Sequence, residues 1–337
     1  MTEILRIRAT WGVDGGKNYE NFARWFPELK ARGYAGIEIN VNGESDFLPD
    51  LPVLRKVCDD NGLEIVVQVV SHWPHAAGPR PAGLQPQQHV EYYRKQLEKA
   101  KELRPLKINA QSGAYVYSNS KDKSVSANDV DILTSKYRDY WTLEESVQFY
   151  KATIEIDAEL GLAGKVVHET HRNRSLFTPY ATAHIIREVP KYECRHLVVL
   201  RHIAKHQYRL RITGDFSHHV VCCERLLDLG EEDKQLLTEI IPHVSHIHAR
   251  IGTTQGSQCP DPSDPTFVAE KTFFDKLWTR IVRDWSKNNP GAPVTFTPEY
   301  GPYPYHAYNA VRDYSEVADT EGARLQNLFQ AALTSAN

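Results

Sequence analysis

The sequence lacks the signals that mark membrane proteins and secreted proteins. It contains no run of about 18 apolar residues, the length that indicates a transmembrane helix. Nor does it begin with a positively charged stretch followed by about 7–15 apolar residues, the pattern of a secretory signal peptide. We therefore predict no membrane span, no membrane partner and a cytoplasmic location.

Cysteine is scarce and has no informative spacing. The 337 residues include five cysteines, and no two of them form a CxxC pair: Cys58, Cys194, Cys222, Cys223 and Cys259. An odd number of scattered cysteines indicates reduced thiols, rather than a disulfide framework or a zinc ribbon.

Neither sign of charge is in excess. The chain has 40 Lys and Arg against 43 Asp and Glu, a net charge of −3, and its pI is about 6.6. A nucleic-acid-binding surface normally shows as a basic excess, so we predict no nucleic-acid partner. The Lys and Arg residues of 89–107 recur at helical spacing, which is typical of the solvated face of an outer helix.

Several local catalytic motifs are also missing. The sequence has no GxSxG, no GxxxxGK[ST] and no HExxH. The glycines of WGVDGGKNYE (11–20) do not have the GxGxxG spacing of a dinucleotide-binding sheet. The chemistry must therefore be sought in residues that are distant along the chain.

Short β-prone apolar segments alternate with amphipathic helical patterns along most of the chain. Eight segments have strand length: 5–11, 35–41, 64–70, 105–110, 164–169, 210–215, 244–249 and 293–299. The clearest helical patterns between them cover 18–33, 48–62, 87–103 and 141–161. Three of these patterns end on Gly33, Gly62 and Gly161, as helix C-termini often do.

This alternation predicts a parallel sheet with helical crossovers, either an open doubly wound sheet or a closed barrel. Because the dinucleotide-binding glycines are missing, we favour a single (β/α)₈ TIM barrel over residues 1–337. Two polar or basic stretches are longer than the connections that a minimal barrel needs. We predict inserted loops at 114–138, after strand four, and at 194–209, before strand six.

Acidic and histidine residues stand where the last four predicted strands end. These are Glu169, Asp215, His248 and Glu299, in that order. A barrel brings the carboxyl ends of its strands to one mouth, so the four side chains should meet there. An isolated acid or histidine usually caps a helix or forms an ion pair, but four at successive strand ends favour one divalent metal ion. Mn²⁺ or Mg²⁺ suits the carboxylates best, and Co²⁺ or Zn²⁺ is also compatible.

Other polar and aromatic residues fall near the same mouth. Candidates for substrate contacts at the ends of strands one to four are Trp11, Glu38, His72, Asn109 and Gln111. After strand five, His171 is a further candidate. Arg172 and Arg174 could form a fork for a carboxylate or phosphate, or only surface salt bridges.

Eight sequence motifs follow one another over nearly the whole chain. In order, they are RATWGVDG, GYAGIEINV, INAQSG, DYW, HETHRNR, GDFSHHVVCCERL, HIHARIGTTQGSQCPDP and TPEYGPYPY. Together they resemble the xylose isomerase-like TIM barrels, also called sugar phosphate isomerases/epimerases. That family includes ketose 3-epimerases, hydroxypyruvate isomerase, 3-dehydroshikimate dehydratase and endonuclease IV.

The resemblance implies roles for individual residues. It implies that Glu169, Asp215, His248 and Glu299 hold the metal, and that His218, three residues after Asp215, touches the substrate. The dehydratases tend to have Gln where His248 stands, so this position favours the isomerase branch. One subgroup often has Trp where His219 stands, and the substrate therefore cannot be carried over.

The resemblance also implies a reaction. We expect a divalent-metal-dependent isomerase or epimerase acting on a small sugar or hydroxycarbonyl compound. Glu169 and Glu299 would transfer the proton through a metal-stabilised enediolate, with His218 and Arg250 as electrophilic partners, although Arg250 could equally pair with a ligand carboxylate.

Alternative functions stay open at this point. One is a metal-dependent lyase or dehydratase of a sugar-derived or cyclic keto substrate. Another is an endonuclease IV-like hydrolase, although the near-neutral net charge disfavours it. The third is a barrel that binds a ligand without turning it over. A homo-oligomer is compatible with the sequence.

Overall fold

The computed structural model describes residues 2–11, 19–40, 50–71, 85–116, 140–189, 209–228 and 230–334. Both predicted insertions, 114–138 and 194–209, lie almost wholly outside these ranges, as does His72.

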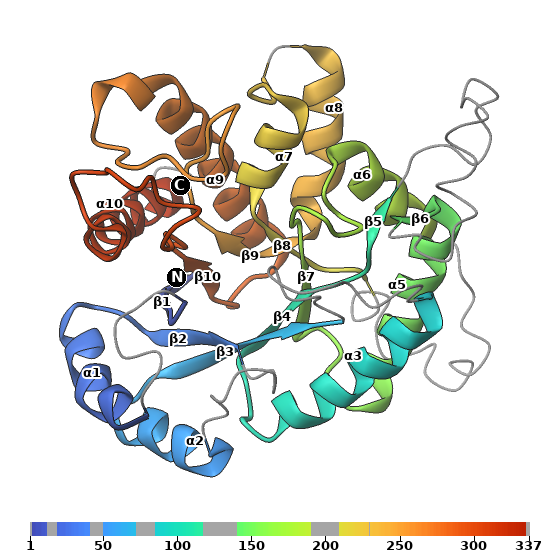
Figure 1. Cartoon of the computed structure of the whole chain (residues 1–337), viewed down its shortest axis with the longest axis horizontal. Coiled ribbons are helices and arrows are strands. Elements are labelled where there is room, and N and C mark those ends of the chain that lie inside the picture. The colour runs from blue at the N-terminus through green and yellow to red at the C-terminus, as the bar shows by residue number, and fades with distance from the viewer. Residues whose placement is uncertain are drawn as a thin grey trace.

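Eight parallel strands form a closed barrel (Figure 1). Around the barrel the order of neighbours is β1, β10, β9, β8, β7, β4, β3 and β2. Their bounds are β1 Ile4–Ala9, β2 Gly36–Asn40, β3 Glu64–Val70, β4 Lys107–Gln111, β7 Val166–Glu169, β8 Ile212–Gly214, β9 Val244–His248 and β10 Val294–Thr297. Each predicted strand coincides with one of these, so the (β/α)₈ prediction is confirmed.

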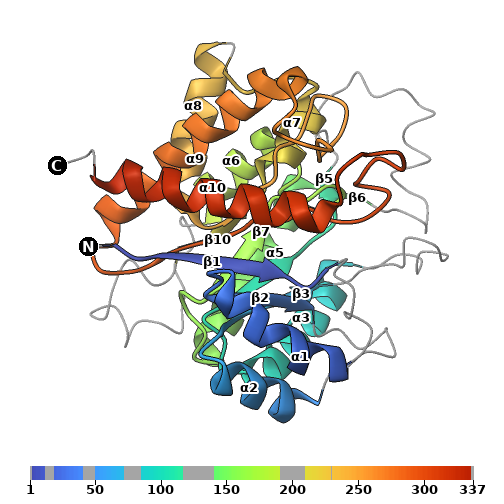
Figure 2. The same cartoon turned by 90° about the vertical axis from the view of Figure 1, so that its left-hand side faces the viewer.

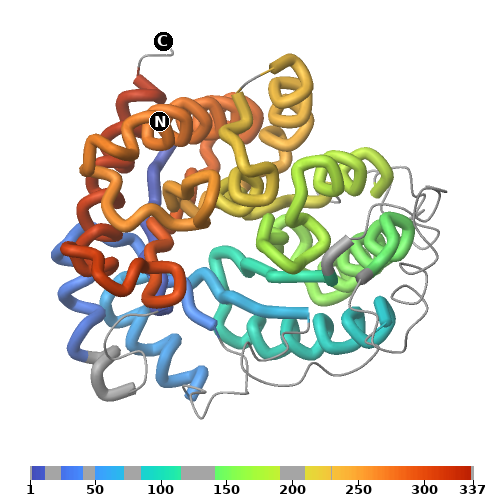
Figure 3. The backbone as a smooth tube through the Cα atoms, turned by 45° about the horizontal axis from the view of Figure 1, so that its top comes forward, coloured from blue at the N-terminus to red at the C-terminus, as the bar shows by residue number. Residues whose placement is uncertain are grey.

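Helices surround the barrel (Figure 3). They are α1 Tyr19–Ala31, α2 Leu51–Asp60, α3 Pro86–Lys101, α5 Leu143–Glu159, α6 Pro179–Glu188, α7 Phe216–Cys223, α8 Glu231–Ile240, α9 Val268–Asn288 and α10 Tyr314–Thr334. A small parallel pair, β5 Tyr115–Val116 and β6 Tyr140–Trp141, lies outside the barrel and was not predicted. Within the described ranges, none of the helices combines the length and the apolarity that spanning a bilayer requires.

Local sequence signals set the helix ends. Gly33, Gly62 and Gly161 all have positive φ, between 59° and 83°, which confirms them as residues that end α1, α2 and α5. At the start of α5, Thr142 accepts a hydrogen bond from the backbone N–H of Glu145 at 3.1 Å, and the Glu145 carboxylate accepts one from the backbone N–H of Thr142 at 2.7 Å. This capping box holds the first turn of the helix.

Apolar side chains fill the space between the barrel and the helices, in two main clusters. On one side Phe26 and Leu54 pack with Ile37 of β2. On the other, Trp278 of α9 and Phe329 of α10 belong to the cluster that includes strand β10. Helix α10 lies along α9 and β1 and covers the seam where the first and last strands meet (Figure 2).

The barrel interior, in contrast, is largely polar. Near its N-terminal end, the Lys107 ammonium donates to the carbonyl of Ser245 across the barrel and lies 4.8 Å from the ring centroid of Trp285. Burial, followed by the charge of Arg211, lowers the pKa of Lys107 to about 7. The polar interior continues towards the C-terminal ends of the strands, where the candidate site lies.

One buried acid joins two of the outer helices. The phenol of Tyr93 on α3 donates to the Asp157 carboxylate on α5 at 2.8 Å. Burial raises the pKa of Asp157 to about 8, even though this hydrogen bond acts in the opposite direction. In the folded protein the acid therefore keeps its proton over a pH range in which the unfolded chain has lost it.

We predict that Asp157→Asn stabilises the protein increasingly as the pH rises from about 4 to about 8. Over that range the unfolded state releases a proton that the native state retains, so wild-type stability falls by up to about 1.4 kcal/mol per pH unit relative to the variant. Urea unfolding across this pH range measures the difference. Glu98 is an exposed residue on α3, so Glu98→Gln is the control. Parallel curves of unfolding free energy against pH for wild type and Asp157→Asn would contradict the prediction.

Candidate active site at the barrel mouth

Four buried side chains converge at the C-terminal end of the barrel. Glu169 and His248 are the last residues of β7 and β9, Asp215 directly follows β8, and Glu299 lies two residues beyond β10. One potential ligand atom from each lies within 4.8 Å of the others. The structure thus brings together the four residues that the strand ends indicate.

A histidine and an arginine lie among the three carboxylates. His248 Nδ1 lies 3.1 Å from Glu299 Oε2 and 3.5 Å from Glu169 Oε1. The Arg250 guanidinium donates to Asp215 Oδ2, and its Nη1 lies 3.4 Å from Glu299 Oε2. Arg250 therefore pairs with two of the carboxylates, which was one of the two roles left open for it.

The electrostatics of the cluster favour additional positive charge. Burial raises the pKa values of Asp215 and Glu299, against the opposing effects of Arg250 and His248. Burial alone would lower the pKa of His248, but the surrounding carboxylates, Glu299 foremost, raise it well above its usual value. Asp215 and Glu299 are therefore costly to keep ionised at this depth without a further cation.

The donor atoms fit a divalent metal ion. Glu169 Oε1 and His248 Nδ1 are buried and have no hydrogen-bond partner among the described residues. Buried polar atoms are normally satisfied, and both of these belong to residues of the converging cluster. Three carboxylates and one imidazole make a set suited to Mn²⁺, Mg²⁺, Co²⁺ or Zn²⁺.

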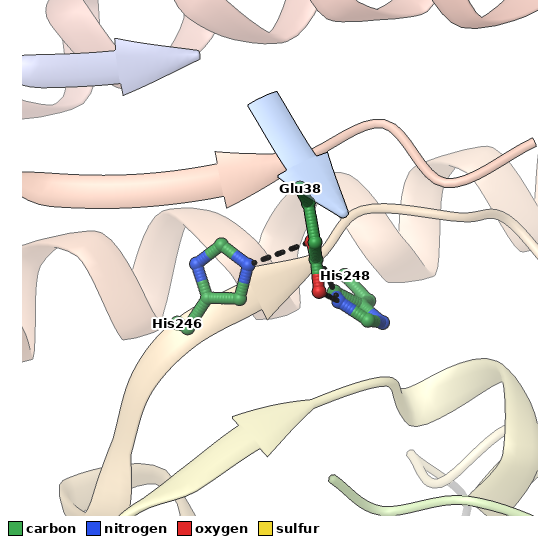
Figure 4. Close-up of side chains that lie close together, drawn as sticks. All are labelled: Glu38, His246 and His248. Atoms are coloured by element: carbon green, nitrogen blue, oxygen red, sulfur yellow. Dashed lines mark hydrogen bonds and ion pairs between the residues drawn. The ribbon is translucent and has the colours of Figure 1, made fainter. Parts of the chain in front are cut away.

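Asn109 connects this cluster with a second buried group beneath it. Its side-chain amide donates to Glu169 Oε2 at 3.0 Å and to Glu38 Oε1 at 2.9 Å. The sequence places Glu38 near the end of its strand. The residue is only 4% exposed, and its carboxylate lies beside His246 and His248 (Figure 4). Glu38 is enclosed because its position on β2, two residues before the strand ends, sets it below the mouth.

Tyr305 organises the outer rim of the mouth. Its ring centroid lies 5.0 Å from that of Trp11, and the guanidinium carbons of Arg172 and Arg250 lie 4.5 Å and 4.7 Å from it. Its hydroxyl lies 3.4 Å from His171 Nε2. Sequence reasoning missed this residue, although it lies six positions after Glu299 in the motif TPEYGPYPY.

Two neutral histidines face each other at the rim, with ring centroids 4.3 Å apart. Burial lowers the pKa of His171 to about 4 and that of His218 well below its usual value. His218 Nε2 accepts from Arg250 at 3.2 Å, so its proton is on Nδ1, which is buried without a partner in the described structure. This N–H is a hydrogen-bond donor suited to a substrate oxygen.

The remaining predicted residues lie apart from this centre. Arg174 is buried and donates to the carbonyl of Gly113 at 3.3 Å, whereas Arg172 is exposed and lies over Tyr305, so the two arginines do not form a fork. Gln111 ends β4 and is buried. Among the described residues, no hydrogen bond links its side chain to Glu169.

Comparisons with known proteins identify the fold. No protein-family model matches the chain, and no curated protein matches its sequence significantly. Solved structures do match. The L-ribulose 3-epimerase structure has a TM-score of 0.59 at 12% identity and covers 100% of this chain and 97% of its own. A D-tagatose 3-epimerase-like protein has a TM-score of 0.55 at 14% identity, with 99% and 100% coverage.

A third match gives the fold its name. It is a xylose isomerase-like TIM barrel/4-hydroxyphenylpyruvate dioxygenase fusion protein, with a TM-score of 0.53 at 12% identity, and the match covers 96% of this chain and 42% of the fusion. The chain has the xylose isomerase-like barrel fold. The resemblance predicted from the sequence motifs is thereby confirmed for the fold.

We predict that Arg250→Gln lowers the unfolding free energy of the metal-free protein by about 3 kcal/mol, because it leaves Asp215 and Glu299 buried without their cationic partner. Urea unfolding in the presence of a chelator measures the loss. Arg312→Gln, which removes a more exposed pair with Asp261, should cost less than about 1 kcal/mol. Equal losses in the two variants would contradict the prediction.

Proposed function

We propose that the chain is a divalent-metal-dependent isomerase or epimerase that transfers a proton at a carbon next to a carbonyl group in a small sugar or hydroxycarbonyl compound. The observation that carries the proposal is the convergence of Glu169, Asp215, His248 and Glu299 within 4.8 Å. The shared fold with the L-ribulose 3-epimerase and the D-tagatose 3-epimerase-like protein supports it.

The four converging residues would hold the metal ion. Mn²⁺ or Mg²⁺ is favoured because three of the four ligands are carboxylates, and the imidazole keeps Co²⁺ and Zn²⁺ compatible. When bound, such an ion would polarise the substrate carbonyl and stabilise negative charge on its oxygen.

Glu169 and Glu299 are the proposed proton-transfer residues. They come from the ends of β7 and β10, which are separated in the barrel by β8 and β9, so they approach a ligand from different sides. One would remove the carbon-bound proton and the other would return one. Return to the same carbon gives an epimer, and return to its neighbour gives an isomer.

The rim residues are proposed to bind the substrate. The Nδ1–H of His218 can donate to a substrate oxygen, and Arg250 lies beside it as a fixed positive charge. Trp11, which is 37% exposed, and Tyr305 form an aromatic wall next to these polar groups. This combination suits a ligand with several hydroxyl groups and an apolar face.

We predict that protein purified without chelator contains one divalent ion per chain, measured by elemental analysis. Chelation should abolish turnover on a panel of ketoses, keto acids and 3-keto-glycosides, and added Mn²⁺ should restore it. A product of unchanged mass identifies isomerisation or epimerisation, whereas loss of water would show a dehydratase instead. Absence of a bound ion would contradict the proposal.

We predict that Glu299→Gln lowers turnover by about 10²–10⁴-fold, because the amide keeps an oxygen ligand but cannot accept the proton. In wild-type protein, solvent deuterium should enter the product at the carbon that exchanges its proton, as followed by NMR. Glu64→Gln, an exposed carboxylate where β3 begins, at the end of the barrel away from the mouth, should leave turnover unchanged. Unchanged turnover in Glu299→Gln would exclude it as an acid or base.

A further inference from the structure

The Glu38 carboxylate is the centre of a buried network that includes His246 and His248, the histidine of the proposed metal site (Figure 4). His248 Nε2 lies 3.0 Å and 3.1 Å from its two oxygens. Asn109 Nδ2 donates to Oε1 at 2.9 Å, and the Thr297 hydroxyl donates to Oε2 at 2.6 Å. His246 Nε2 lies 3.4 Å from Oε2. The carboxylate is therefore held by groups from β4, β9 and β10, as well as by its own strand.

These contacts determine which nitrogen of the His248 ring donates to Glu38 and which one faces the proposed ion. A carboxylate only accepts hydrogen bonds, so the ring nitrogen that faces Glu38 must carry the hydrogen. The opposite nitrogen, Nδ1, is the atom that faces Glu169 and Glu299, and it has no hydrogen-bond partner among the described residues. Without an ion, Glu169 and Glu299 favour a hydrogen on Nδ1 as well. A cation held by these carboxylates would replace that hydrogen and take the Nδ1 lone pair, while the Nε2–H stays on Glu38.

We propose that Glu38 is a positioning residue for the metal centre: it holds the Nε2–H of His248 and thereby turns Nδ1 towards the ion. The inference rests on the proposed metal site. A carboxylate behind a ligating histidine fixes the orientation of the ring and makes it a stronger ligand. Asn109 extends this support, because the same amide also donates to Glu169 Oε2.

A different arrangement would place the ion lower, between Glu38, His246 and His248, whose ligand atoms also lie within 4.8 Å of one another. The existing hydrogen bonds oppose it. The Glu38 oxygens already accept from Asn109 and Thr297, and His246 Nδ1 is bonded to the Thr295 hydroxyl at 2.8 Å. An ion there would have to displace the hydrogen from His248 Nε2 and the hydrogen bonds that Asn109 and Thr297 donate to Glu38.

The test compares Mn²⁺ affinity in wild type, Glu38→Gln and the control Glu64→Gln, measured by calorimetry on folded, metal-free protein. We expect Glu38→Gln to bind one ion per chain about 10- to 100-fold more weakly, and Glu64→Gln to bind like wild type. Thr297→Val removes one hydrogen bond to Glu38 with little change in shape, and should weaken binding in the same direction but less. It serves as the test variant if Glu38→Gln does not fold.

Co²⁺ absorption gives a readout of ligand geometry that does not depend on catalysis. The visible spectrum should change in Glu38→Gln and stay the same in Glu64→Gln. Wild-type affinity and an unchanged spectrum in Glu38→Gln would overturn the inference while leaving the proposed function intact. Binding retained in Asp215→Ala, which removes a ligand of the upper site only, but lost in His246→Gln would also overturn it, because the ion would then occupy the lower cluster. Failure of wild type to bind any ion would instead refute the proposed function itself, and the inference with it.

Discussion

The burial of three carboxylates in one barrel mouth is the constraint on which the rest of the site depends. Glu169, Asp215 and Glu299 are carried by strands that are hydrogen-bonded to parallel neighbours, so they cannot move apart without disrupting the barrel. Negative charges held together away from water require compensation. Arg250 supplies the protein's fixed positive charge beside Asp215 and Glu299, and the proposed divalent ion would supply the remainder.

The fold separates this chemistry from the source of its stability. Apolar side chains lie mainly between the strands and the helices, while the interior of the barrel carries groups such as Lys107, Asn109 and His246. TIM barrels usually fill that interior with branched apolar side chains. Here a hydrogen-bonded column from Thr295 through His246 to Glu38 takes their place. A buried polar network of this kind is stabilising only when its members are paired, which fixes each side chain in one orientation.

The rule that parallel strands send their carboxyl ends to one mouth predicted most of the site. It placed Glu169 and Glu299 together although 130 positions separate them, because strand ends alone decide that convergence. The same rule does not give the depth at which Glu38 is buried, since it ignores how far each side chain lies below the strand end. It also missed Tyr305, which follows the last barrel strand in a stretch without periodicity and reaches the rim only through the path of its loop.

The sequence by itself determined the eight-fold alternation, the helix ends at glycine and the identity of the four converging residues. Each of these follows from local periodicity or from the position of a residue relative to the end of a strand. Only the tertiary structure decided which nitrogen of His248 faces Glu38 and which carboxylates Arg250 pairs with. Those choices depend on contacts across the barrel, such as the one between Glu38 and His248, 210 residues apart. No local pattern encodes such a contact, because it exists only once the closed sheet has set the depth and direction of each side chain.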